Sequence, residues 1–227
     1  MLSVSNLKSR VGSFELAVDD FTVPSGELLS VLGVSGSGKS TLLNVLAGFL
    51  PMVSGTINVG ETNVADLRPE HRKIGVVFQR AALFPHLSVR QNIEFPLKVQ
   101  KRSDFDEQVQ VWLRRLGIEE LDKRLPHEIS EGQAQRVAIA RAFITGFSTI
   151  LMDEPFSALD TETRASLRDE LRTLVTETQC SVLMVSHHLE DAKAISDSVM
   201  ILNQGRTQWQ GSVTDWDQSL RQQSPTS

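Results

Sequence analysis

Hydrophobic residues in the first part of the chain are grouped into short runs that are separated by turn residues. The run Leu28–Leu32 is almost entirely apolar and predicts a buried strand, and a helical pattern follows it over residues 39–49. Two further segments, 52–60 and 72–79, are bounded by glycine or charged residues and predict strands. The order strand, loop, helix is typical of the start of an α/β domain.

The pattern changes over residues 80–143, where strand signals disappear and apolar residues recur at helical spacing. Ser103 and Asp106 have the spacing of a capping pair, so we expect Ser103 to cap a helix. The apolar face of this helix would consist of Phe105, Val109, Trp112 or Leu113, and Leu116. This stretch is expected to be a helical insert in a sheet domain.

Nearly continuous apolar runs return at residues 149–155 and 181–188, as is typical of parallel strands that are covered on both faces. A crossover helix between them would bury one face, made of Leu167, Leu171, Leu174 and Val175. We expect residues 1–219 to form one domain with the helical subdomain at about 80–143. The Gln- and Ser-rich end, 220–227, is expected to be disordered.

Composition and charge exclude some classes of function. The chain has 40% hydrophobic residues, which is ample for a core. Lys and Arg number 23 against 28 Asp and Glu, so the net charge of −5 gives no reason to expect a nucleic-acid partner. No apolar run approaches the ~18 residues that a membrane span needs, so we expect any span to belong to another chain.

A glycine-rich motif follows the first predicted strand. Residues 33–41 read GVSGSGKST and fit the phosphate-binding pattern G-x-x-x-x-G-K-[ST] at every fixed position. Main-chain N–H groups of such a loop surround a phosphate chain, Lys39 reaches the outer phosphates, and the Ser40 hydroxyl can coordinate Mg²⁺. The alternative is a simple Gly/Ser turn. The expected nucleotide-binding residues are Gly33, Val34, Ser35, Gly36, Ser37, Gly38, Lys39, Ser40 and Thr41.

A pair of acids ends the predicted strand at residues 149–155. Asp153 and Glu154 would lie at the carboxyl end of the strand, where α/β sheets bind their ligands. One carboxylate suffices to hold Mg²⁺, and we assign this role to Asp153. The second, Glu154, suggests a base that activates water for attack on a γ-phosphate, which favours hydrolysis over phosphoryl transfer to a substrate. A solvated helix start before Pro155 is the alternative.

Together these motifs resemble the ATP-binding subunits of ABC transporters, up to about Gly211. The resemblance implies a P-loop NTPase core, which is a mainly parallel sheet with flanking helices. It also implies an N-terminal antiparallel β portion and an inserted helical subdomain. Gln79 in GVVFQ is similar to the Q-loop glutamine, which senses Mg²⁺ and the attacking water, and the SALD segment 157–160 is similar to the D-loop. His187 matches the switch histidine that contacts the γ-phosphate.

The resemblance also implies roles for individual residues. Glu154, His187, Gln79 and Lys39 would be catalytic. The ligands of Mg²⁺ would be Ser40, Gln79 and Asp153.

The segment ISEGQ, residues 129–133, lies where that family has its LSGGQ signature. By resemblance, Ser130, Gly132 and Gln133 would contact ATP that is bound to a second copy of the chain. Ser130 and Gln133 also form a capping-box pair, which predicts a helix start independently of any ligand. Glu131 replaces a glycine, and its carboxylate would be unfavourable near a γ-phosphate unless it points into solvent. We interpret the segment as a working variant.

Base recognition is less clearly marked. The family usually has a stacking aromatic residue before the glycine-rich loop, and the corresponding segment here is SRVGSF. Stacking by Arg10, apolar contact with Val11 and a shifted Phe14 remain alternatives for the adenine contact.

The segments FPHLSVRQNI and DEPFSALD resemble importer subunits of the thiamine, ferric-iron, polyamine and sulfate group. This implies an ATPase that uses ATP and Mg²⁺ and forms a homodimer. Integral membrane permease subunits would dock near residues 79–89, at the cytoplasmic face of the cell membrane, and serve a solute-binding protein indirectly. An exporter or lipoprotein-release ATPase and a non-transport ABC ATPase are the alternatives.

Overall fold

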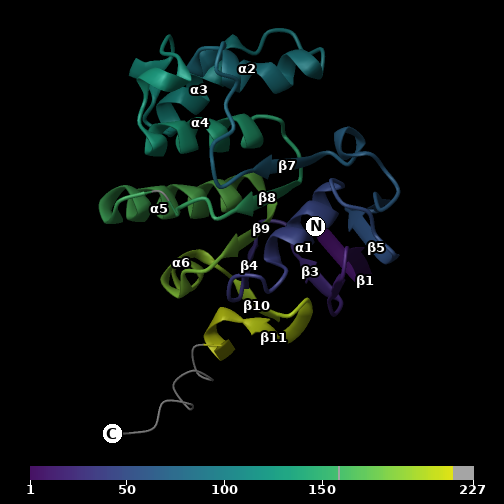
Figure 1. The fold of residues 1–227 in the computed structure, drawn as a ribbon. Coiled ribbons are helices and arrows are strands. Elements are labelled where there is room, and N and C mark those ends of the chain that lie inside the picture. Colours follow the sequence, from purple (N-terminus) through teal and green to yellow (C-terminus); the bar gives the residue numbers. More distant parts are fainter. Residues whose placement is uncertain (158, 217–227) are drawn as a thin grey trace, which may run out of the picture.

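The computed structural model describes residues 1–157 and 159–216 and contains one large mixed sheet (Figure 1). The predicted disordered end, 220–227, lies outside these residues. Five neighbouring strands are parallel to one another, in the order β10, β4, β9, β8, β7. Their bounds are β4 (Leu28–Leu32), β7 (Ile74–Val77), β8 (Thr149–Asp153), β9 (Ser181–Ser186) and β10 (Ser198–Asn203). The predicted parallel core is therefore confirmed.

The remaining strands extend the sheet beyond β10 in a largely antiparallel arrangement. They are β1 (Leu2–Val11), β2 (Phe14–Ala17), β3 (Phe21–Val23), β5 (Ser54–Val59), β6 (Thr62–Asn63) and β11 (Arg206–Ser212). β1 pairs antiparallel with β2, β3 and β5, and β11 pairs antiparallel with β10. This confirms the N-terminal antiparallel portion.

Helices cover both faces of the parallel strands. Alternate residues of a strand point to opposite faces, and in β9 Leu183 packs toward α1 (Lys39–Ala47) while Met184 packs toward α5 (Thr161–Thr178). The buried residues of α5 are Leu167, Leu171, Leu174 and Val175, as predicted. A third helix, α6 (Leu189–Ile195), lies beside α5 (Figure 1). These two separate cores explain why the strands are apolar at nearly every position.

The loop that follows β6 fixes the end of α1. Arg72 is 5% exposed, and its guanidinium donates to the carbonyl oxygens of Val45 and Leu46, both at 2.9 Å. These carbonyls lie in the last turn of α1, where carbonyl groups lack the full set of partners found in the middle of a helix. Gly48 has a φ of 86° and ends the helix two residues before the predicted limit. A side chain here would collide with Arg72, whose Nε lies 2.6 Å from the Cβ position.

The insert between β7 and β8 is helical throughout its regular part. Its helices are α2 (Val89–Val99), α3 (Asp106–Arg115) and α4 (Glu131–Phe143), with short 3-10 turns at Glu119–Leu121 and Pro126–Glu128; a further 3-10 turn, Pro69–His71, precedes β7. In Figure 1 the helices α2, α3 and α4 lie at the opposite end of the molecule from β11. None of the helices within residues 1–157 and 159–216 combines the length and apolar character that a membrane span requires.

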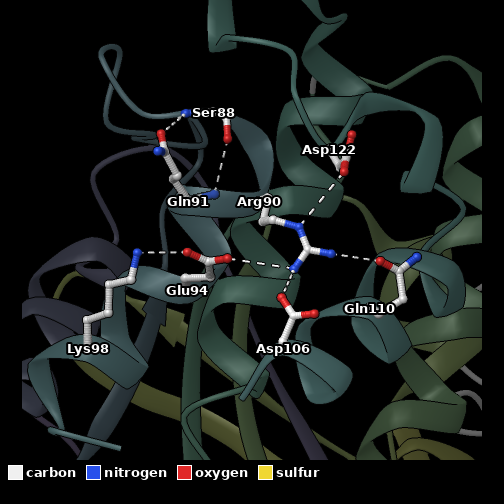
Figure 2. Close-up of polar contacts among 8 residues, drawn as sticks. All are labelled: Ser88, Arg90, Gln91, Glu94, Lys98, Asp106, Gln110 and Asp122. Carbon is white, nitrogen blue, oxygen red and sulfur yellow. Dashed lines mark hydrogen bonds and ion pairs between the residues drawn. The ribbon is translucent and has the colours of Figure 1, made fainter. Parts of the chain in front are cut away.

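Arg90 connects the helices of the insert (Figure 2). Its guanidinium in α2 donates to Asp106 and Gln110 of α3, each at 2.8 Å, and lies 3.8 Å from Asp122. The predicted cap of α3 by Ser103 is wrong, because the residue at the N-cap is Phe105 and makes no side-chain capping bond. The chain turns at Asp104, with a φ of 56°, and Asp106 is used for the ion pair with Arg90.

Candidate active site

The glycine-rich loop connects β4 to α1 and wraps around the amine of Lys39. Lys39 Nζ donates to the carbonyl oxygens of Gly33 at 2.7 Å and Val34 at 3.0 Å. Gly38 has a φ of 107°, which side chains rarely adopt, and a Cβ there would lie 2.9 Å from the Phe14 ring. A Cβ at Gly33 would lie 2.2 Å from the main-chain oxygen of Leu202. The loop therefore needs glycine at both positions.

A cleft of about 650 Å³ opens above this loop. This volume is in the range of small-molecule sites. Its lining consists of Phe14, Ser35, Gly36, Gly38, Lys39, Ser40, Thr41, Glu154 and His187. Two other predicted loop residues do not line the cleft: Ser37 is buried, and Val34 is 71% exposed. The structure thus brings the loop together with two of the predicted catalytic side chains.

The Glu154 carboxylate is held from two sides. His187 Nδ1 lies 3.0 Å from Oε1, and Gln79 Nε2 donates to Oε2 at 3.2 Å. Glu154 has a φ of 45°, which costs about 1 kcal/mol for a residue with a side chain, and its N–H donates to Val185 at 2.9 Å. The sharp turn at the end of β8 directs the carboxylate into the cleft. Three predicted catalytic residues from three separate segments meet at this point.

Asp153 precedes Glu154 at the end of β8, as predicted. Burial raises the pKa of its carboxyl, and the nearby charge of Glu154 raises it further, whereas Lys39 lowers it. A divalent cation would offset the cost of keeping this carboxylate ionised. The described residues contain no cluster of three or more His, Cys, Asp or Glu side chains arranged for a metal. Ser40, Gln79 and Asp153 carry the oxygen donors that Mg²⁺ prefers, and this ion needs few protein ligands when phosphate and water supply the others.

Of the three alternatives for the adenine contact, the structure places only Phe14 at the cleft. Arg10 forms an ion pair with Glu15 and lines a separate pocket of about 310 Å³. Val11 lies at the end of β1 and is 41% exposed. The Phe14 side chain is half-buried, its ring lies next to Gly38, and it lines the cleft.

The predicted capping box at the start of α4 is confirmed. Gln133 N–H donates to Ser130 Oγ at 3.2 Å, and Ser130 N–H donates to Gln133 Oε1 at 2.9 Å. A Cβ at Gly132 would lie 3.1 Å from the Leu159 side chain, so glycine allows α4 to approach the start of α5 closely. Glu131 is exposed in the first turn of α4.

Ser130, Gly132 and Gln133 belong to a second cleft of about 750 Å³. It is lined by Leu116, Gly117, Ser130, Glu131, Gly132, Gln133, Arg136, Leu159, Asp160, Thr163 and Ser166. It shares no residue with the cleft above the glycine-rich loop. One copy of the chain therefore does not bring these two sets of predicted nucleotide-binding residues into one site.

The segment that resembles the D-loop makes two contacts that the sequence analysis did not predict. The Ser157 hydroxyl accepts a hydrogen bond from Gln79 at 3.4 Å, and no local pattern predicts this contact between distant segments. Asp160 caps α5 by accepting from the N–H groups of Glu162 and Thr163, at 3.1 and 3.0 Å. An aspartate directly before a helical pattern is a capping signal, so this second contribution was readable from the sequence.

A glycine-rich loop between a strand and a helix, with a lysine and a strand-end acid at the same cleft, defines a P-loop nucleoside triphosphatase. The comparison with known families is more specific. The chain belongs to the ABC transporter family, whose model matches residues 16–157.

Individual relatives agree with this assignment. The chain is 40% identical to the sulfate/thiosulfate import ATP-binding protein CysA of Nocardia farcinica, over 95% of this chain and 66% of the relative. It is 41% identical to the spermidine/putrescine import ATP-binding protein PotA of Marinobacter nauticus, over 93% of this chain and 57% of the relative. The chain thus spans less than two thirds of the length of these curated relatives.

A solved structure has the same fold. The ATP-binding cassette MJ0796, in a dimeric post-hydrolysis state bound to ADP and Pi, superposes with a TM-score of 0.81 at 28% identity. The match covers 94% of this chain and 99% of that one.

Proposed function

We propose that this chain is the ATP-hydrolysing subunit of a binding-protein-dependent ABC importer of a small solute or ion. The observation that carries the proposal is the Glu154 carboxylate, which is held between Gln79 and His187 at the cleft that Lys39 lines. The import function in the printed names of the relatives supports import over the exporter alternative.

In this proposal the triphosphate of ATP lies along residues 33–41, and Lys39 exchanges its two carbonyl partners for phosphate oxygens. Glu154 accepts a proton from the attacking water, and Gln79 orients the carboxylate and the water. His187 would contact the γ-phosphate. Mg²⁺, held by Ser40, Gln79 and Asp153, would neutralise charge on the phosphate oxygens.

The position of the second cleft, apart from the first, favours a dimer. We propose that Ser130, Gly132 and Gln133 of one copy close over ATP bound to the loop of another copy, because the positive end of α4 and the Ser130 side chain lie at this cleft. Residues 1–219 would act as one ATPase domain. Closure would move permease subunits docked near residues 79–89, at the cytoplasmic face of the membrane, and a solute-binding protein would supply the cargo.

Replacement of Glu154 by Gln tests the proposed role directly. Glutamine keeps the size and one acceptor oxygen but cannot accept a proton, so we expect turnover to fall by at least about 100-fold while ATP binding is retained. Steady-state ATPase assays and nucleotide titration measure the two quantities. Glu70→Gln, at an exposed position in the 3-10 turn before β7, is the matched control and should retain normal turnover. Near-normal turnover in Glu154→Gln would remove the residue from this role.

A further inference from the structure

The main chain on both sides of Gln79 is held by side chains of α4. Gln135, which is 4% exposed, donates from Nε2 to the carbonyl oxygen of Phe78 at 3.4 Å. Arg141 donates from Nη2 to the carbonyl oxygen of Ala81 at 3.1 Å. The two donors are six positions apart, which corresponds to about 9 Å along a helix, and they reach carbonyls three positions apart. A single helix, α4, therefore holds the main chain before and after Gln79, the residue that contacts Glu154.

The Arg141 side chain makes further contacts beside this segment. Its guanidinium lies 5.5 Å from the centroid of the Phe84 ring and 3.5 Å from Asn92 Oδ1. Burial lowers the pKa of Arg141, and within the part of the chain that the structure describes it forms no ion pair with a carboxylate. A half-buried arginine whose partners are main-chain oxygen, amide oxygen and an aromatic face fixes geometry and does not neutralise a charge.

Asn92 of α2 holds the far end of the same segment. It is fully buried, accepts from the N–H of Phe84 at 2.8 Å, and donates to the carbonyl oxygens of Phe84 and Leu87. Between the two attachment points the chain has no regular structure, and Ala82 has a φ of 45°. A strained, irregular segment persists only when its surroundings determine its conformation, and these contacts provide that restraint.

The other end of α4 carries Ser130 and the capping box that opens the second cleft. A displacement of α4 would therefore move Phe78 and Ala81 with it and alter the contact between Gln79 and Glu154. We propose that Gln135 and Arg141 are positioning residues, which set the geometry of Gln79 against Glu154 according to the position of α4. This inference rests on the proposed function, because it concerns the rate of the same hydrolysis.

A double-mutant cycle separates positioning from a general loss of stability. In the full-length chain we expect Arg141→Met to lower kcat roughly 10-fold while KM for Mg-ATP stays within about 2-fold, because the loop at residues 33–41 is untouched. Arg141→Lys should restore part of the rate. In a Gln79→Ala background, which still contains Glu154, Arg141→Met should lower kcat by less than about 2-fold, since the contact that Arg141 positions is already absent. Gln135→Leu should behave in the same way.

Arg102→Met is the control and should leave kcat unchanged, because the exposed Arg102 side chain donates to Gln108 of α3, away from residues 78–84. An equal loss of kcat from Arg141→Met in both backgrounds, or normal kcat in the single variant, would overturn the inference. Hydrogen exchange without nucleotide gives an independent readout, and residues 78–84 should exchange faster in Arg141→Met than in Arg102→Met. Unchanged exchange at residues 78–84 would also overturn the inference. Absence of turnover in the wild-type chain, with faster exchange in the variant, would contradict the proposed function and leave only the restraint.

Discussion

The Glu131 carboxylate is favourable at the start of a helix but would be unfavourable next to a phosphate ligand. It lies in the first turn of α4, where a carboxylate interacts favourably with the positive end of the helix. The same carboxylate lines the second cleft, beside Ser130 and Gly132, where a phosphate of the partner copy would bind. The capping box between Ser130 and Gln133 starts the helix without help from Glu131. The start of α4 therefore does not depend on the charge of Glu131 alone.

We expect Glu131→Gln to strengthen the ATP-dependent dimer roughly tenfold, because each of two sites loses a repulsion of about 0.5–1 kcal/mol. The effect should shrink as salt is added. Analytical ultracentrifugation of the Glu154→Gln chain, with and without this second change, gives the dimer constant. Glu131→Gly should give a similar gain but a less stable helix, since glycine costs about 1 kcal/mol within a helix.

Glu120→Gln, at an exposed residue of the insert outside the second cleft, is the control and should leave the dimer constant unchanged. A dimer constant that is indifferent to Glu131 would show that this carboxylate points away from the phosphate.

Single residues were predictable where spacing alone fixes their place. Lys39 and Ser40 follow from the loop pattern, and Glu154 follows from the end of a strand, and all three line the same cleft. Phe14 was left undecided against Arg10 and Val11, because the choice depends on the hairpin of β1 and β2 that brings Phe14 over Gly38. Such a contact depends on tertiary pairing and carries no local signal.

At the scale of elements, α5 begins at the second cleft, and its N-cap residue Asp160 stabilises this helix start. Asp160 accepts from two main-chain N–H groups at the start of α5. Hydrogen bonds from the side chain and main chain of Thr163 lower the pKa of the Asp160 carboxyl below its ordinary value of 3.8. The ionised form is therefore favoured in the folded chain. Its contribution to stability is present above pH 3.8 and is lost as the pH falls through the lower, folded pKa.

We expect Asp160→Asn to lower Tm at pH 7 and to lower it less as the pH falls below 3.8 and through the folded pKa, where the wild-type carboxyl becomes neutral as well. Asparagine caps a helix nearly as well as aspartate, so the difference reports the charge. Thermal unfolding followed by circular dichroism across this pH range measures it. Asp160→Ala removes the cap itself and should lower Tm at every pH. A constant difference between wild type and Asp160→Asn would contradict the pKa shift.

Helices were predictable to the extent that one face is buried against a sheet. The four apolar residues that predict α5 are the four that it buries. The body of α3 was predicted as well, but its start was not, because Asp106 contacts Arg90 across the insert and Phe105 occupies the N-cap position. Local capping rules fail where a tertiary ion pair uses the same residue.

The whole molecule has two clefts with complementary chemistry. The first contains a lysine, a glycine-rich loop and the Glu154 carboxylate held by Gln79 and His187, whereas the second contains the start of α4 with the Ser130 side chain. Neither cleft shares a residue with the other within one chain. A nucleotide that needs both sets of groups therefore needs two copies of the chain.

The sharpest test of this arrangement keeps the helix start and changes only its charge. Aspartate and asparagine both cap helices well, so Ser130→Asp and Ser130→Asn should preserve the start of α4. We expect the Glu154→Gln chain to be a monomer without nucleotide and a dimer with saturating Mg-ATP. Adding Ser130→Asp should abolish the dimer through repulsion of the partner's γ-phosphate, while Ser130→Asn should weaken it by far less.

Each copy of the Ser130→Asp variant should still bind ATP with unchanged affinity, because residues 33–41 lie in the other cleft. Sedimentation velocity and nucleotide titration measure the two properties separately. A parallel loss of ATP affinity would mean that Ser130 acts on the nucleotide of its own chain. A dimer that tolerates Ser130→Asp, or a Glu154→Gln chain that stays monomeric with its permease present, would contradict the shared site.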